Sequence, residues 1–139
     1  MANVKYNNFG STIAKNDMDG VALKAMFMAT SYTPDPDGHQ FVSDIVASRA
    51  SGTSDLALSS FTITINDTDD ATDFDVADLV TGTITATTAQ VVIYIDTGVE
   101  STSELLCALD LLAGSTPTTF SVVSGVLTAK VNARGIFSI

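Results

Sequence analysis

The sequence has few charged side chains, and most of those are acidic. Lys and Arg together number 6 and Asp and Glu 16, which gives a formal net charge of −10. Charged residues make up 16% of the 139 residues, against about 25% in an average soluble domain. An acidic chain with scattered cations is a poor ligand for phosphate backbones and anionic lipids. We therefore expect no nucleic-acid and no membrane partner.

Residues that carry metal and redox chemistry are also scarce. The chain has one cysteine and one histidine, so it has no disulfide framework and too few nitrogen and sulfur ligands for a typical zinc site. Cys107 lies in the apolar run ELLCALDLL, where we expect a buried core thiol. Glycine-rich phosphate loops, C-x-x-C and H-E-x-x-H motifs are missing as well. We expect no catalytic residue, no metal and no cofactor, and predict that the chain is not an enzyme.

Long apolar segments are missing too. No run approaches the roughly 20 residues of a transmembrane helix, and the first residues do not resemble a secretory signal. The chain is therefore expected to be made in the cytoplasm. Residues 1–20 are polar and rich in asparagine, and we interpret them as an extended N-terminal arm. Residues 21–139 are expected to form a single domain.

Threonine, serine and β-branched residues take the place of the missing charges. The clearest strand is in ALSSFTITIND, where Phe61, Ile63 and Ile65 alternate with threonines. VALKAMFMATSY (residues 21–32) has residues that favour helix, but its Ser-Tyr-Thr-Pro exit favours a buried strand, which we predict. ELLCALDLLAG fits a strand or a short helix. Short strands at close spacing predict a mainly β fold, a sandwich or small barrel.

Two acidic stretches offer ligand types for a metal or for acid–base chemistry. In SYTPDPDGHQFVSDI, His39 lies near Asp35, Asp37 and Asp44, but TPDPDG is typical turn sequence. We interpret these side chains as turn formers, followed by one helical turn in HQFVSDIVAS with Phe41, Val42 and Ile45 facing inward.

The second stretch is DTDDATDFDVAD, from Asp67 to Asp78. It departs from a calcium-binding EF-hand loop at Thr72, where glycine is required, and at Asp78, where glutamate is typical. A solvated acidic loop anchored by Phe74, Val76 and Leu79 and a calcium site between strands both stay open.

Three parts of the chain resemble small virion structural proteins of tailed bacteriophages. They are KAMFMATSYTPDPDGHQFVSDI followed by ASGT, VVIYIDTG with STSELLCALDL, and the ending NARGIFSI. Family members show a hydrophobic strand that ends in Ser-Tyr-Thr-Pro, an Asp-rich turn and then Phe-Val-Asp-Ile or similar. The resemblance covers roughly residues 21–139. This chain departs from the family in having no tryptophan and in having Arg134 within the closing motif.

The resemblance implies a β-rich subunit on the capsid surface, a decoration or cement protein. Its implied partners are the major capsid protein and further copies of itself, with a trimer favoured by capsid symmetry. The low charge agrees with a subunit that loses surface on assembly. A tail, collar or baseplate subunit is the alternative, and a small calcium-binding or hydrolytic module is a third possibility.

We assign the contact with the coat or with a neighbouring copy to the arm. The predicted binding residues are Val4, Lys5, Tyr6, Asn7, Asn8 and Phe9, with Tyr6 and Phe9 as apolar anchors. If the arm only docks on a partner, its removal should leave the stability of the domain nearly unchanged.

Overall fold

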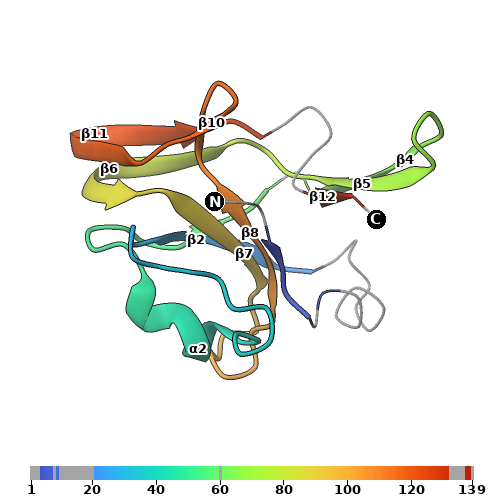
Figure 1. Cartoon of the computed structure of the whole chain (residues 1–139), viewed down its shortest axis with the longest axis horizontal. Helices are drawn as coiled ribbons and strands as arrows, with labels where there is room; N and C mark the ends of the chain where they lie inside the picture. Colours follow the sequence, from blue (N-terminus) through green and yellow to red (C-terminus); the bar gives the residue numbers. More distant parts are fainter. Residues whose placement is uncertain (1–3, 8, 10–20, 60, 132–136, 139) are drawn as a thin grey trace.

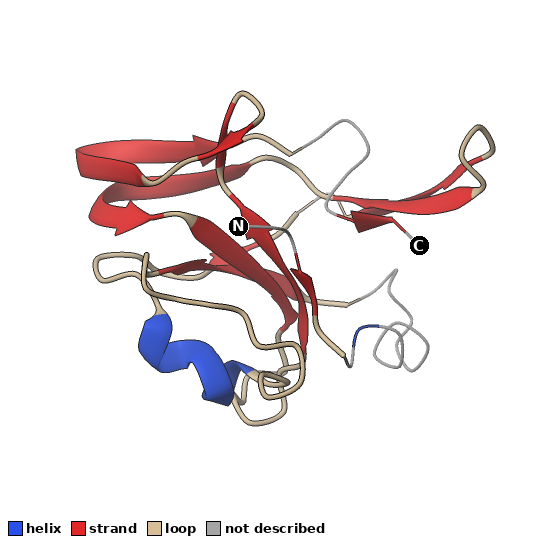
Figure 2. Cartoon of the chain, in the orientation of Figure 1, coloured by secondary structure: helices blue, strands red, loops and turns tan. Residues whose placement is uncertain are grey.

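Strands dominate the structure, a computed structural model that describes residues 4–7, 9, 21–59, 61–131 and 137–138. Strands predominate over helices among these residues, in several antiparallel sheets arranged as a small β-sandwich-like domain (Figures 1 and 2). The predicted mainly β fold class is confirmed.

A five-stranded antiparallel sheet forms the centre of the molecule. Its order is β1 (Val4–Lys5), β8 (Leu105–Asp110), β7 (Gln90–Ile95), β2 (Leu23–Met28) and β3 (Leu56–Ala57). Every residue of β7 and all but one of β2 are buried. Strands covered on both faces have continuous apolar runs instead of alternation, which explains why residues 21–32 also fit a helix. The predicted strand there is confirmed, and ELLCALDLLAG forms a strand.

The first face of the sheet is covered by the segment around α2 (Val42–Ile45) and the 3₁₀ turn η2 (Val46–Ser48) (Figure 2). Val42 and Ile45 are buried against the sheet residues Met26, Val92 and Tyr94. The predicted helical turn is therefore confirmed. Within the described ranges, no helix is long and apolar enough to cross a membrane.

The opposite face is covered by a two-stranded ribbon formed by β6 (Leu79–Thr88) and β11 (Phe120–Ala129). Phe27, Val91 and Ile93 of the sheet share a core with Leu79, and Phe120 of the ribbon packs against it. Two very short strands, β9 (Leu112–Ala113) and β10 (Thr116–Pro117), lie between β8 and β11. The ribbon and the sheet are the two layers of the sandwich.

The remaining sheet contains a hairpin that projects from the rest of the domain (Figure 1). It has the order β12 (Phe137–Ser138), β5 (Ala71–Asp75) and β4 (Thr62–Asn66). Residues 71–75 were expected in a loop but pair with β4, so the loop shrinks to residues 67–70. The apolar anchors Phe74, Val76 and Leu79 are buried as predicted.

The first described residues belong to the packed domain, in contrast to the expected separate arm. Val4 and Lys5 pair with β8 at the edge of the central sheet. The side chains of Tyr6 and Phe9 are buried, Tyr6 in the core on the α2 side and Phe9 in the core under the ribbon. The rest of the proposed arm, residues 1–3, 8 and 10–20, lies outside the described residues.

Candidate functional site

The stretch around His39 is built as a turn. The Asp35 carboxylate accepts hydrogen bonds from the backbone N–H groups of Asp37 and Gly38, both at 3.1 Å. His39 stacks on the Tyr32 ring, and its Nδ1 atom accepts the backbone N–H of Asp35 at 3.2 Å. Such local bonds are the usual role of aspartate in turns. The interpretation of Asp35 as a turn former is confirmed.

Asp44 has a separate structural role at the start of α2. Its Oδ2 atom accepts the backbone N–H groups of Gln40 and Phe41, both at 2.9 Å. These bonds satisfy donors that a helix start leaves without partners. The bond from Phe41, then that from Gln40, lowers the pKa of the Asp44 carboxyl. The carboxylates of Asp35 and Asp44 therefore serve two different backbone segments.

The acidic residues 67–78 are likewise distributed over several structural tasks. Asn66 accepts the backbone N–H groups of Thr68 and Asp69 and so closes the hairpin turn. Asp75 accepts the adjacent backbone N–H of Val76, whereas Asp78 accepts that of Val131, 53 residues away. In the described part of the chain, no three His, Cys, Asp or Glu side chains are grouped so that they could hold a metal. The strand pairing of residues 71–75 is the reason why these carboxylates diverge.

Cys107 is buried in the core, as predicted. Burial raises the pKa of its thiol to about 12. A thiol in this state is inert, since the thiolate is the nucleophile.

A cluster of charged and polar side chains at the start of β2 and the end of β7 was not predicted. Asp55 accepts two bonds from the Arg49 guanidinium, at 2.8 and 3.0 Å, and one from the Tyr94 hydroxyl at 2.6 Å. Lys24 pairs with Asp96 at 2.8 Å. Both cations are neutralised by a neighbour, so the small adjoining cavity of about 220 Å³ offers little charge to a ligand. The partners are 6 to 72 residues apart in sequence, so no local sequence pattern predicts the cluster.

The predicted binding residues 4–9 are mostly engaged within their own chain. The Tyr6 hydroxyl bonds to that of Tyr32, and Lys5 lies 5.2 Å from the centre of the Phe9 ring. Asn7 is exposed but donates a side-chain hydrogen bond to Asp37, and Asn8 lies outside the described residues. A partner role for residues 4–9 stays a prediction, but the two apolar anchors on which it depended are part of the core.

The exposed side of the β6–β11 ribbon is an uncharged surface. Neither ten-residue strand contains a charged side chain. Val80, Val123 and Val126 are 54%, 79% and 55% exposed. The exposed polar residues around them carry only hydroxyl groups: Thr83, Thr85, Thr87, Ser121, Ser124 and Thr128. This face of the ribbon has no charged side chain, and depletion of charged residues is typical of the centre of a protein interface.

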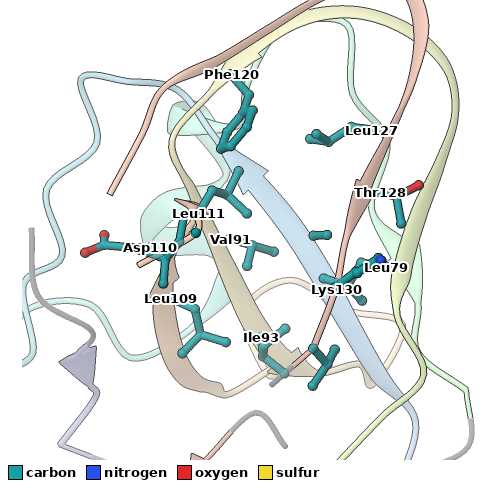
Figure 3. A pocket seen from close by; sticks show the side chains of 14 residues that line it. Leu79, Val91, Ile93, Leu109, Asp110, Leu111, Phe120, Leu127, Thr128 and Lys130 are labelled. Atoms are coloured by element: carbon teal, nitrogen blue, oxygen red, sulfur yellow. The ribbon is translucent and has the colours of Figure 1, made fainter. Parts of the chain in front are cut away.

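An apolar groove opens between the ribbon and the central sheet (Figure 3). Its volume is about 660 Å³, and Val91, Ile93, Leu109, Phe120 and Leu127 line it. Lys130 adds a positive charge to the lining, and the Asp110 carboxylate is turned away from Val91 and Leu127 (Figure 3). The lining comes from segments between residues 79 and 131, so only the fold brings it together. Grooves of this kind take up apolar side chains.

Comparisons with protein-family models, with curated proteins and with solved structures give no match for this chain. The uncharged ribbon, the apolar groove and the projecting hairpin are therefore the features on which a function can be argued. All three are suited to contacts with proteins.

Proposed function

We propose that this chain is a structural virion protein of a tailed bacteriophage that binds the outside of the assembled capsid and stabilises the coat lattice. The proposal starts from the resemblance of residues 21–139 to small virion proteins. The observation that carries it is the uncharged β6–β11 ribbon with its exposed valines.

The ribbon is unusual for a chain with a net charge of −10. Acidic side chains are numerous elsewhere, yet the ribbon has none on either strand. Depletion of charged side chains is typical of the centre of a contact site, and the three exposed valines add apolar area to this face. The strands also differ from aggregation-prone edges, because hydroxyl groups separate the valines. An extended protein surface with few charges at the contact is the partner that fits this face, and we assign that surface to the coat lattice.

Stabilisation of the lattice would follow from mass action. A subunit that binds the assembled coat but not free coat protein shifts the equilibrium towards the assembled state. The chain's own rigid core supports this role, because the ribbon packs on the central sheet through Phe120 and Leu127. Stabilisation of the lattice in this way requires binding alone and no chemical reaction.

Sedimentation with assembled coat shells tests the proposal. The purified chain should sediment with shells of the coat protein and should not bind unassembled coat protein. Val123→Asp places a charge at an exposed position of the ribbon, and we expect it to weaken shell binding by about tenfold or more, as for a central contact residue.

Val99→Asp is the control, because Val99 is also an exposed valine, at 54% against 79% for Val123, but lies in the loop after β7. It should bind shells like the unmodified chain. Equal binding by the Val123→Asp variant, with its fold retained, would rule out the ribbon as the coat-binding face.

A further inference from the structure

An apolar stripe runs along the projecting hairpin from the core to the tip. Phe61 stacks on the buried Phe74, with ring centres 6.1 Å apart, and both belong to the core under the ribbon. Ile63 pairs across the strands with Phe74, and Ile65 pairs with Thr72. Ile63 is 43% and Ile65 77% exposed. The outer end of the stripe is therefore not covered by other described residues of the chain.

The outer edge of the hairpin is also open. β4 is the last strand of its sheet, with β5 as its one partner among the described residues. Natural proteins protect such edges with charges, prolines or bulges, but β4 has the sequence TITIN. An exposed edge strand with exposed isoleucines is a contact site by its composition.

The groove between the ribbon and the central sheet has the complementary character. It is apolar, it is open, and its volume of about 660 Å³ can take several side chains. Lys130 in its lining is exposed and forms no ion pair among the described residues. The hairpin loop carries Asp67, Asp69 and Asp70, and residues 62–75 include no lysine or arginine. Hairpin and groove therefore match in apolar character. Lys130 offers a partner to the acidic loop, and the other charged lining residue, Asp110, accepts a hydrogen bond from the Gln90 side chain at 3.0 Å.

The hairpin cannot reach the groove of its own chain. In Figure 1 the β4–β5 loop points away from the ribbon. The groove is lined by residues of the ribbon and the central sheet and by Leu112 and Gly114 next to β9. The two complementary surfaces of one chain can meet only between copies.

We propose that the β4–β5 hairpin of one copy docks in the apolar groove of the next copy, with Ile63 and Ile65 against the apolar lining and the aspartates of the loop near Lys130. The contact joins two different surfaces, so it repeats from copy to copy and closes into a ring when the rotation allows it. A closed trimer is the arrangement that the proposed function favours. The inference deepens that function by assigning the contact between copies, and its test needs no coat protein.

Sedimentation-velocity measurements on the full chain test the docking. The unmodified chain should form a closed oligomer with a dissociation constant below ~100 µM. Ile65→Asp should raise the dissociation constant by about tenfold or more, because it buries a charge in an apolar groove. Val123→Asp, on the ribbon but outside the groove lining, should leave the oligomer intact even where it prevents shell binding.

A charge exchange provides a second and independent test. Lys130→Asp should weaken the oligomer by placing a negative charge near the acidic loop, and Asp67→Lys combined with Asp69→Lys should restore it. Both sets of positions are exposed. Asp69 also accepts a hydrogen bond from the Asn66 side chain, so the melting temperature of each variant is measured to show that its fold is retained. A chain that stays monomeric at ~100 µM, or an oligomer unaffected by Ile65→Asp and by Lys130→Asp, would overturn the proposal. Failure of shell binding alone would instead count against the proposed function.

Discussion

Most polar residues that suggest chemistry in this sequence act on the backbone next to them. Asp35 holds a turn, Asp44 holds the start of α2, and Asn66 closes the hairpin loop. Aspartate and asparagine have this role because their short side chains reach backbone N–H groups nearby. The turn could be predicted from the sequence for that reason. The Arg49–Asp55–Tyr94 cluster could not, because Tyr94 comes from a strand 39 residues away from Asp55.

Replacement of Asp44 tests whether such a hydrogen bond to the backbone stabilises the fold. Asp44→Ala leaves the N–H groups of Gln40 and Phe41 without their acceptor, and we expect a loss of about 1 kcal/mol in the free energy of unfolding. Since the folded state lowers the pKa of Asp44, its stabilisation is present above the ordinary aspartate pKa of about 4 and is lost as the pH falls through the lower folded value.

Urea unfolding at several pH values measures the effect. The difference between the unmodified chain and Asp44→Ala should be full at neutral pH and shrink in acid. Ser43→Ala, at the exposed neighbouring position, should change stability little. A difference that grows as the pH falls would contradict the assigned role of Asp44.

Gly52 lies where the chain passes very close to the ribbon. A Cβ atom at this position would be 2.2 Å from the backbone carbonyl oxygen of Thr85, and its φ is +85°. Gly52→Ala therefore combines left-handed strain with a backbone clash, and we expect it to cost about 3 kcal/mol or more.

Gly98→Ala separates the two effects. Gly98 has nearly the same φ, +84°, but open space around it, so strain alone should cost about 1 to 2 kcal/mol. Thermal melting of both variants measures the difference. Equal destabilisation would mean that the contact between Gly52 and Thr85 does not constrain the fold.

At the scale of elements, the sequence predicts where strands form more reliably than it predicts which of their faces are buried. The alternation in FTITIN predicts a strand, and β4 forms there, but its isoleucines are exposed. An alternating pattern implies that one face of the strand is covered. Only the structure shows that this hairpin projects from the rest of the domain. The central strands show the reverse, because burial on both faces removes the alternation.

The N-terminal strand is the element whose role the structure changes most. Its polar sequence suggests a removable arm, but Tyr6 is buried beside Tyr32, 26 residues away. Tyr6→Ala should lower the free energy of unfolding by about 3 to 5 kcal/mol, as for other large core side chains. Asn7→Ala removes an exposed side-chain hydrogen bond to Asp37 and should cost only about 1 kcal/mol or less.

Chemical unfolding of both variants measures the contribution of this strand. If Tyr6→Ala unfolds at the same denaturant concentration as the unmodified chain, Tyr6 does not contribute to the core. Residues 4–9 would then act as a separate arm that could bind a partner.

At the scale of the whole molecule, the proposed contacts lie on different parts of one domain. The β6–β11 ribbon is assigned to the coat, and the hairpin and the groove are assigned to neighbouring copies. The low content of charged residues could be recognised in the sequence and indicated lost surface. The location of that surface could not be predicted from the sequence, because the groove and the ribbon combine segments from residue 79 to residue 131.

The amount of this chain in purified phage particles tests the central claim most directly. A protein that decorates the capsid lattice should be present at on the order of hundreds of copies per particle, in a fixed ratio to the coat protein. Quantitative mass spectrometry of purified particles measures that ratio. A count of about a dozen, as symmetry sets for a connector or tail ring, or the absence of the chain from the particles, would contradict the account.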